Sequence, residues 1–478
     1  MNTTPRKRRG LLVVAIALVG LGLWGYWYFT RDIPEEFASD VDHYKYGSIG
    51  AEREGGIPYS VWKVMPRICP DKLPRGETGY ESFGFVLEPG RDRPIGWSSR
   101  ILGVRRVGMS CSVCHTGTYR ETPASQPRIV LGMPPSRLDL QAFTHFMLEC
   151  SQDERFTVGR VWEEVRRDGE ASWFHAAVQS VTVPVMRRQL KKVADELAYM
   201  GSQPKWGPGR VDDFNPVKAI VLKKPFDNTI GYVDPRPAWY LQRFASKGGN
   251  RLWFHWDGNN RDILDRDMAT AVVVGAQPEH MDLSGIRRIE LFLTDLPVTP
   301  YPFPVDQQLA AKGKAVFDRE CASCHAPDSE LLTEVVPIEE IGTDPHRLEA
   351  LTPDLLHALD TMFIGGQVNH PGGYRKTNGY SRVPLDGLWA CGPYLHNGSV
   401  PTLWDLLQPP EQRPKVFYRG YDVFDQEKVG FISSGPAAEA EGFRYDTSLP
   451  GNGNQGHTYG TNLSVNEKKA LLEYLKSL

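Results

Sequence analysis

Two five-residue stretches of the chain share the pattern Cys-x-x-Cys-His. A thiol pair at this spacing can add to the two vinyl groups on one edge of a haem, and the adjacent histidine then binds the iron as proximal ligand. The pattern predicts two covalently bound haem c groups. The expected cofactor-binding residues are Cys111, Cys114, His115, Cys321, Cys324 and His325, with His115 and His325 as metal ligands.

Two other uses of paired cysteines agree less well with this pattern. Structural zinc needs four ligands, but the two pairs lie 210 residues apart and each keeps its trailing histidine. A thioredoxin-like redox motif normally occurs once, in a βαβ context that is absent here. Among the remaining cysteines, Cys69 and Cys150 flank the first motif and are candidates for a disulfide, which would leave Cys391 as a buried free thiol.

The second axial ligand of each iron decides its chemistry, because a filled position favours electron transfer and an open one can bind oxygen or peroxide. For the second haem we favour His457, in GNGNQGHTYG (451–460), because a flexible Gly/Asn loop lets a side chain approach a flat ring closely. His396 and Met362 remain alternatives. The other histidines of this region are His346, His357 and His370, and those available to the first haem are His145, His175 and His255.

The elements that position these residues can be outlined from the pattern. PVTPYPFPVD (297–306) contains four prolines and predicts an extended linker. We expect an enlarged N-terminal haem c domain over residues 31–296 and a C-terminal haem c domain over 307–478. The predicted fold is mainly α, with two cytochrome c-like haem domains, long loops and little sheet.

Several stretches have helical periodicity. The helix over 307–320 and a final helix begun by a capping box at Ser464 and Glu467 should cross beside the second haem, and Gly313 would permit a close crossing. Further helices are expected over 136–150, 158–167, 187–200 and 353–363.

The first thirty residues form the remaining segment. Arg6, Lys7, Arg8 and Arg9 precede an apolar run over 11–30 that ends in tryptophans and tyrosines. Twenty residues at about 1.5 Å each match the ~30 Å hydrocarbon core of a bilayer. We therefore expect residues 1–30 to be a cytoplasmic basic stub and a transmembrane signal anchor. This predicts a single-pass protein of the bacterial inner membrane, with the haem domains in the periplasm and with a membrane or periplasmic electron donor or acceptor.

The composition sets two limits. The 478 residues are 41% hydrophobic and 24% charged with a net charge of -3, an ordinary globular mixture. A basic helix or long basic arm is absent, which argues against a nucleic-acid partner. We detect no internal repeat beyond the five-residue motif.

The chain resembles the bacterial di-haem cytochrome c peroxidase superfamily, whose members carry two C-x-x-C-H domains in this order. Within it, the chain is most similar to the rubber-oxygenase-like di-haem c-type cytochromes, although those are secreted and this chain is expected to be anchored. The stretches that carry the resemblance are RRVGMSCSVCHTGTYR (105–120), WGPGRVDDFNP (206–216), LWFHWDGNNRDILDRD (252–267), VPLDGLWACGPYLHNGSVPTLWDLL (383–407) and YDTSLPGNGNQGHTYGTNLS (445–464).

The resemblance implies roles for the two haems. It implies a bis-histidine second haem, in agreement with His457, and a first haem with an open side lined by apolar and aromatic groups. Phe214, Trp206 and Arg210 are the candidate catalytic residues there, and an ion pair with Asp212 is an equal alternative for Arg210. Trp253, Trp256 and Trp389 are candidate electron-transfer intermediaries. Calcium occurs in the peroxidase relatives, but the HWDGNNRD stretch matches a calcium loop too weakly to predict it.

The expected function is that of an oxidoreductase in which the N-terminal haem activates O2 or H2O2 and the C-terminal haem stores and relays electrons. A distal carboxylate that would mark a peroxidase cannot be named from the sequence. Two other readings remain open: a non-catalytic electron-transfer cytochrome, and an enzyme that oxidises side chains of a partner protein.

Overall fold

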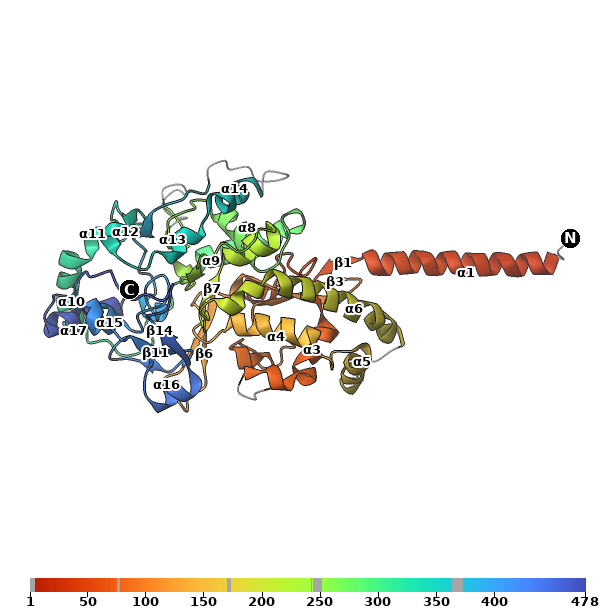
Figure 1. Cartoon of the computed structure of the whole chain (residues 1–478), viewed down its shortest axis with the longest axis horizontal. Coiled ribbons are helices and arrows are strands. Elements are labelled where there is room, and N and C mark those ends of the chain that lie inside the picture. The colour runs from red at the N-terminus through yellow and green to blue at the C-terminus, as the bar shows by residue number, and fades with distance from the viewer. Residues whose placement is uncertain (1–4, 75–77, 170–172, 242, 244–251, 363–372) are drawn as a thin grey trace.

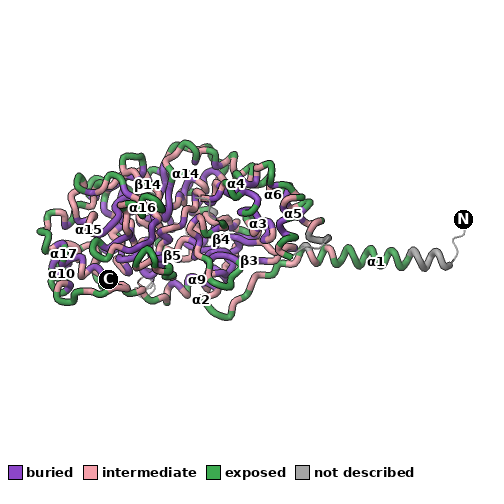
Figure 2. Tube along the Cα trace, turned by 90° about the horizontal axis from the view of Figure 1, so that it is seen from below, coloured by how far each residue is buried: buried purple, intermediate pink, exposed green. Residues whose placement is uncertain are grey.

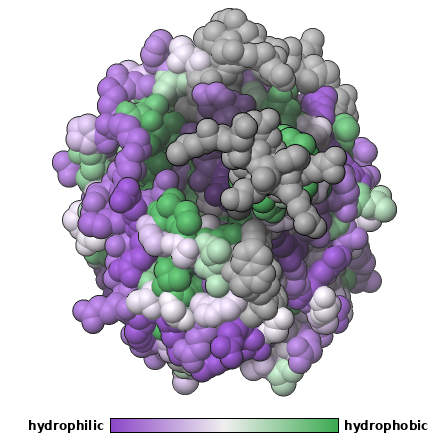
Figure 3. Space-filling view, turned by 90° about the vertical axis from the view of Figure 1, so that its right-hand side faces the viewer, coloured by the Kyte–Doolittle hydropathy of each residue, from purple (hydrophilic) through white to green (hydrophobic). Residues whose placement is uncertain are grey.

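The computed structural model describes residues 5–74, 78–169, 173–241, 243, 252–362 and 373–478. The N-terminal and C-terminal halves of the chain occupy opposite ends of an elongated body, and helix α1 (Pro5–Thr30) projects from the N-terminal end (Figure 1). Buried residues fill the interior of both halves (Figure 2). Hydrophilic residues cover much of the face from which α1 projects, beside a smaller group of hydrophobic ones (Figure 3).

The fold is mixed: 45% of the chain is helical and 12% is strand, so the prediction of a mainly α fold with little sheet is wrong. A four-stranded antiparallel sheet in the order β1-β3-β4-β2 lies directly before the first Cys-x-x-Cys-His motif. The sheet could not be recognised from the sequence, because its strands do not alternate between buried apolar and exposed polar residues. Some of its arginines are at least partly buried and paired with carboxylates. Arg100, for example, lies buried in β3, where it binds Asp32 and Asp282.

The helices are short except for α1 and α6. Most of the helices predicted from the sequence are present to within a few residues. The helix predicted over 187–200 is part of the longer α6 and a following 3-10 turn. The further helices are α2 Asp40–Tyr46, α3 Tyr59–Ile68, α4 Leu140–Gln152, α5 Val158–Arg167, α6 Trp173–Glu196, α8 Ile263–Val273, α9 Leu283–Asp295, α10 Gln307–Glu320, α11 Ala322–His325, α12 Ile338–Ile341, α13 His346–Ala350, α14 Pro353–Met362, α15 Leu403–Leu406, α16 Pro436–Glu441 and α17 Val465–Leu475.

The strands of the large sheet are β1 Asp32–Pro34, β2 Ile57–Pro58, β3 Trp97–Leu102 and β4 Val104–Met109, with Trp97 opposite Met109 across the β3–β4 hairpin. Five antiparallel pairs complete the set: β5–β6, β7–β8, β9–β10, β11–β14 and β12–β13. Their bounds are β5 Thr116–Tyr119, β6 Arg128–Leu131, β7 Val211–Asp212, β8 Tyr232–Val233, β9 Val335–Pro337, β10 Gly379–Ser381, β11 Val416–Arg419, β12 Phe424–Asp425, β13 Gly430–Phe431 and β14 Phe443–Asp446.

The expected transmembrane anchor over residues 11–30 is not supported. Within the described part of the chain, no helix combines the length and the apolar character needed to cross a membrane. This finding contradicts the predicted anchor and the single-pass inner-membrane location.

The C-terminal half contains the predicted helix crossing. Helices α10 and α17 pack against each other, and a Cβ atom at Gly313 would collide with the carbonyl oxygen of Ala470. The capping box of Ser464 and Glu467 begins α17 as expected. The proline-rich segment 297–306 packs against this core, since Trp389 Nε1 donates to the carbonyl of Thr299 at 2.9 Å.

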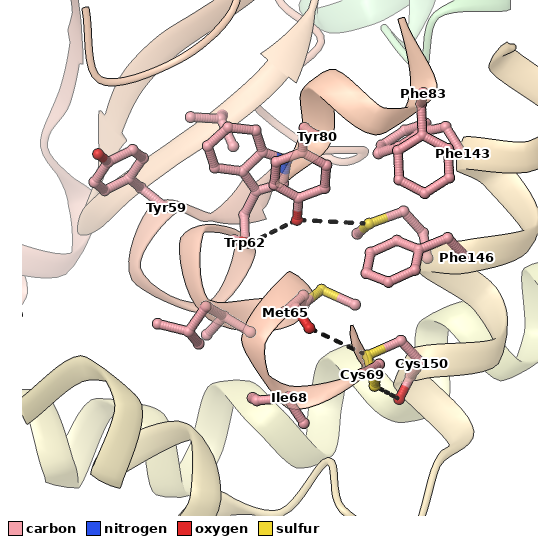
Figure 4. Close-up of a cluster of buried hydrophobic side chains, with 14 of the residues drawn as sticks. Tyr59, Trp62, Met65, Ile68, Cys69, Tyr80, Phe83, Phe143, Phe146 and Cys150 are labelled. Carbon is pink, nitrogen blue, oxygen red and sulfur yellow. Dashed lines mark hydrogen bonds between the residues drawn. A yellow bond between two sulfur atoms is a disulfide. The ribbon is translucent and has the colours of Figure 1, made fainter. Parts of the chain in front are cut away.

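A cluster of stacked aromatic side chains forms the core of the N-terminal half (Figure 4). The rings of Trp62 and Tyr80 lie 4.4 Å apart, and the Tyr80 hydroxyl donates to the Trp62 carbonyl at 2.6 Å. Below them, a disulfide joins Cys69 in the segment after α3 to Cys150 in α4, which confirms the predicted pairing. Cys391 is a free, half-buried thiol.

Candidate functional site

The first Cys-x-x-Cys-His motif joins two strands. Strand β4 ends at Met109, a single 3-10 turn carries Cys111 and Cys114, and β5 begins directly after His115. Both thiols are free, and burial raises the pKa of each to about 12. The motif thus places two protonated thiols and one imidazole on a short turn between strands β4 and β5.

His115 is fixed through its backbone. Its carbonyl accepts hydrogen bonds from the Tyr44 hydroxyl at 2.5 Å and from the Gly132 N–H at 2.8 Å. Burial lowers the pKa of its imidazole to about 4, so the ring is neutral at neutral pH, as a metal ligand must be. This neutral, buried ring next to two free thiols fits attachment of a haem.

The three motif residues open onto a cavity of about 190 Å³. Phe214 lines this cavity, and the guanidinium of Arg347 lies over its ring at 4.4 Å. Other residues in the wall are Leu140, Val217, Tyr240, His255, Arg266 and Asp267. The cavity is thus largely apolar, with a few charged groups at defined positions.

The carboxylates of this cavity are paired. Asp213 accepts two hydrogen bonds from Arg347, at 2.7 and 3.1 Å. Asp267 pairs with Arg266, and burial raises the pKa of Asp267. The imidazole of His255 is held by Asn259, with Nδ1 and Oδ1 2.5 Å apart. Among the described residues, no aromatic or imidazole ring contacts the ring of His115.

The second motif follows a helix. Cys321 ends α10, and the four-residue helix α11 carries Cys324 and His325. The ring nitrogen Nδ1 of His325 lies 2.9 Å from the carbonyl oxygen of Val383. Because a carbonyl can only accept, Nδ1 carries the proton and Nε2 is left with a free lone pair. This is the tautomer that a metal-binding histidine needs.

His325 and His457 meet in a second cavity of about 230 Å³, which Cys321 and Cys324 also line. Their ring centres are 6.4 Å apart and their planes are inclined at 46°. Metal–imidazole bonds of about 2.0–2.1 Å on both sides of one ion place ring centres roughly 6 Å apart. The two rings therefore have the separation expected of a pair of axial ligands. Burial lowers the pKa of His457 to about 4, which keeps this ring neutral as well.

The loop that carries His457 is well anchored. The N–H of His457 donates to the carbonyl of Ile341 at 2.8 Å. Arg413 donates to three successive parts of the loop: the carbonyls of Asn454 at 2.6 Å, Gly456 at 2.8 Å and His457 at 3.1 Å. His457 itself has a φ of 44°. The glycines and asparagines thus permit an unusual backbone path, and Arg413 fixes it, so flexibility is not the reason for His457's position.

The alternative ligands for this cavity are placed less suitably. His396 is buried and lines the cavity, but its Nε2 lies 3.0 Å from the Tyr380 hydroxyl and its ring stacks on that tyrosine at 4.0 Å. His346 is hydrogen-bonded to Asp344, and neither it nor His357 lines the cavity. The side chain of Met362 and the whole of His370 lie outside the described residues.

The three residues predicted to be catalytic at the first haem are not brought together. Phe214 lines the first cavity, whereas Trp206 and Arg210 line neither cavity. Arg210 is fully buried and donates to the carbonyls of Trp206 and Lys205 and, at 2.7 Å, to Asn452. It therefore joins the two halves of the molecule. His145 does not line the cavity, and the side chain of His175 lies outside the described residues.

The two cavities share a wall. Asp234, Pro235, Arg236 and Trp256 line both of them. Trp256 Nε1 donates to the carbonyl of Asp234 at 2.8 Å. Of the three tryptophans proposed as electron-transfer intermediaries, Trp256 is thus the one between the cavities, whereas Trp253 and Trp389 line neither.

The structure also reveals a repeated loop that the sequence analysis missed. Residues 254–260 (FHWDGNN) and 394–400 (YLHNGSV) adopt the same conformation. In each, the N–H of the first residue donates to the carbonyl of the last at 2.6 Å. The second residue has a positive φ (65° and 67°), and so does the glycine at the fifth position (56° and 62°). Each loop contributes to one or both cavities, which makes the halves more alike than the five-residue motif alone suggests.

Within the described ranges, no group of three or more histidine, cysteine, aspartate or glutamate side chains is arranged to hold a metal ion. The 255–262 stretch is instead occupied by internal hydrogen bonds such as the one from Asn259 to Asp257 at 2.8 Å.

A comparison with known protein families matches one segment of the C-terminal half. Residues 379–418 match the RoxA-like, cytochrome c-like family. This segment holds Tyr380, Val383, His396 and Arg413, which surround the second cavity or anchor its loops. The chain is therefore related to RoxA-like c-type cytochromes, which supports covalently bound haem c as its cofactor.

Two relatives align over longer stretches. The uncharacterized protein y4iJ of Sinorhizobium fredii (strain NBRC 101917 / NGR234) is 30% identical over 504 residues, covering 84% of this chain and 81% of y4iJ. The uncharacterized protein y4iM of the same strain is 31% identical over 267 residues, covering 46% of this chain and 60% of y4iM.

Proposed function

The chain belongs to the same family as the y4iJ protein of Sinorhizobium fredii, and we propose that it is a di-haem c-type cytochrome that acts as an oxidoreductase. The N-terminal cavity is the reaction site for O2 or H2O2, and the C-terminal cavity is the electron store. The observation that carries this division is the arrangement of the imidazoles. In the second cavity the rings of His325 and His457 lie 6.4 Å apart, whereas among the described residues no ring pairs in this way with His115, and His255 in the first cavity is held by Asn259.

The residues that would hold the cofactors follow from the cavity walls. Cys111, Cys114 and His115 would hold one haem, and Cys321, Cys324, His325 and His457 the other. Bound haem c supplies one-electron redox chemistry and, where an axial position stays open, a binding site for O2 or peroxide.

The protein residues of the second cavity favour electron transfer. Val383 fixes the tautomer of His325, and Arg413 and Ile341 fix the backbone of His457. A haem held in this cavity would meet two rigidly held, neutral imidazoles, those of His325 and His457. Fixed ligands keep small molecules out and reduce the rearrangement that accompanies a change of charge.

The residues of the first cavity favour binding of a small apolar or weakly polar molecule. Phe214 and its aliphatic neighbours exclude water from one part of the wall. Asp213 and Asp267 are each engaged by an arginine, so charges of opposite sign are paired within the wall. His255 is the neutral ring in this wall, oriented by Asn259. Transfer of electrons between the sites would pass through the shared wall, where Trp256 lies.

Electron paramagnetic resonance of the resting ferric protein tests this proposal. One high-spin and one low-spin signal of equal intensity are expected. Consumption of O2 or H2O2 should then accompany oxidation of a supplied donor or an unsaturated hydrocarbon. Two low-spin signals and no consumption would instead indicate an electron carrier that only exchanges electrons with partner proteins.

A further inference from the structure

We infer that Arg236 is a shared anion-binding residue, whose guanidinium holds carboxylate groups of the cofactors in both cavities. The inference rests on the proposed presence of two haems, each of which carries carboxylates at its edge. It is carried by three features of Arg236 itself: its place in the wall, its rigid segment and its unpaired charge.

Arg236 stands in the wall that the two cavities share. Trp256, the other large residue of that wall, lies beside it, with the Arg236 guanidinium 5.4 Å from the centre of its ring. On the other side, the guanidinium lies 4.4 Å from the ring of Tyr240. These aromatic faces stabilise the cation and restrict its position, but they offer no negative charge.

The backbone around Arg236 is rigid. Proline stands on both sides of it, at positions 235 and 237, which restricts the backbone of all three residues. On one side, the carboxylate of Asp234 accepts two hydrogen bonds from buried Arg419, at 2.8 and 3.1 Å. On the other, the Ala238 N–H donates to the carbonyl of Gly132 at 2.8 Å. The segment thus holds one side chain at a fixed place between two sites.

Among the described residues, Arg236 has no carboxylate partner of its own: Asp386 acts on it electrostatically, but pairs with Arg243. The residue is 6% exposed, and its Nη1 has no hydrogen-bond partner. Across the described ranges, no carboxylate forms an ion pair with it, and Asp234 is already engaged by Arg419. Burying an unpaired cation is costly, so such a group is normally found with an anion. A molecule that enters the cavities can supply this anion.

Haem carboxylates meet this need on both sides. A planar guanidinium has five N–H donors and can bind more than one carboxylate oxygen at once. One residue in the common wall would therefore orient both cofactors and set a common electrostatic environment for them. The positive charge favours the reduced state of each iron, which carries one positive charge fewer.

The test compares reduction potentials of both haems in the full chain, measured by spectroelectrochemical titration in the absence of any substrate. Arg236→Gln and Arg236→Met remove the charge and should shift both midpoint potentials to more negative values. Arg236→Lys keeps the charge and should give a smaller shift at both. Arg100→Gln is the matched control, because Arg100 is equally buried, at 6% exposed, but lines neither cavity, and it should leave both potentials unchanged.

The haem content of each variant is measured first by intact mass. Absence of two haems in the parent protein would refute the proposed function itself. Two haems with potentials that Arg236→Gln or Arg236→Met does not move would overturn only the role of Arg236. A shift at one haem alone would also overturn it, since the residue would then serve a single cavity. Arg236→Met is the second neutral variant if Arg236→Gln does not fold.

Discussion

The imidazole rings of His325 and His457 share one cavity, with their centres 6.4 Å apart, although the two residues come from opposite ends of the C-terminal half. His325 belongs to α11, whereas His457 belongs to the loop before α17. The ring of His325 is held by the carbonyl of Val383, and the position of His457 is fixed through its own backbone. Contacts within the protein thus hold both rings in place, which is the arrangement that a pair of metal ligands needs.

Replacement of His457 tests this pairing. In His457→Ala the second haem should lose its low-spin, six-coordinate spectrum, because no other described imidazole is free to take the position. The absorption and magnetic resonance spectra of the ferric protein report the change. His346→Ala is the control, since His346 is hydrogen-bonded to Asp344 and lies outside the cavity wall. An unchanged low-spin signal in His457→Ala would contradict the assignment.

Arg413 should control how firmly His457 is held. Arg413→Ala removes the donors to the carbonyls of Asn454, Gly456 and His457. Each buried acceptor left unsatisfied costs about 1–3 kcal/mol. We expect a lower melting temperature and a mixture of high-spin and low-spin signals at the second haem. A variant that loses stability but keeps a pure low-spin spectrum would show that the loop is held without Arg413.

The crossing of α10 and α17 should depend on Gly313. Gly313→Ala places a methyl group against the carbonyl of Ala470, and overpacking of this kind costs about 1–3 kcal/mol. Gly159→Ala in α5 is the matched control, because a Cβ there has no neighbour within 4 Å. The control should be neutral or more stable by about 0.4–1 kcal/mol. Denaturant unfolding of both variants measures the difference, and equal stabilities would contradict the close crossing.

The disulfide between Cys69 and Cys150 should stabilise the N-terminal half without affecting either haem. It links positions 81 residues apart, and the paired replacement Cys69→Ala with Cys150→Ala should cost about 2–4 kcal/mol. Neither cysteine lines a cavity, so the ferric spectra should stay those of the parent. Differential scanning calorimetry and absorption spectra check the two parts separately. A changed haem spectrum would show that the aromatic core reaches the site.

Local patterns predicted much of the helical structure and the residues at the cavities. The capping box at Ser464, the periodicity of 307–320 and the two Cys-x-x-Cys-His motifs each depend on neighbours in sequence, and such signals are readable without a fold. His457 was found for a partly wrong reason. Its Gly/Asn loop suggested mobility, but the anchor of that loop is Arg413, whose contacts depend on tertiary structure.

The features that were missed depend on long-range packing. From the sequence, Arg100 and other arginines of the sheet resemble surface residues, because the carboxylates that pair with them lie far away in the sequence. Arg210 and Trp206 stand close to Phe214 in sequence, but only Phe214 faces the cavity. The Pro-Arg-Pro run at 235–237 could have drawn attention to Arg236. Two prolines around one charged residue indicate a rigid backbone that holds the charged side chain in a fixed position.

Intact mass spectrometry of the mature protein, followed by peptide mapping, tests the central claim most directly. The account predicts an added mass equal to two haems, one on the peptide with Cys111 and Cys114 and one on the peptide with Cys321 and Cys324. A protein without added haem, or with haem on one peptide only, would contradict the claim that both cavities are haem sites.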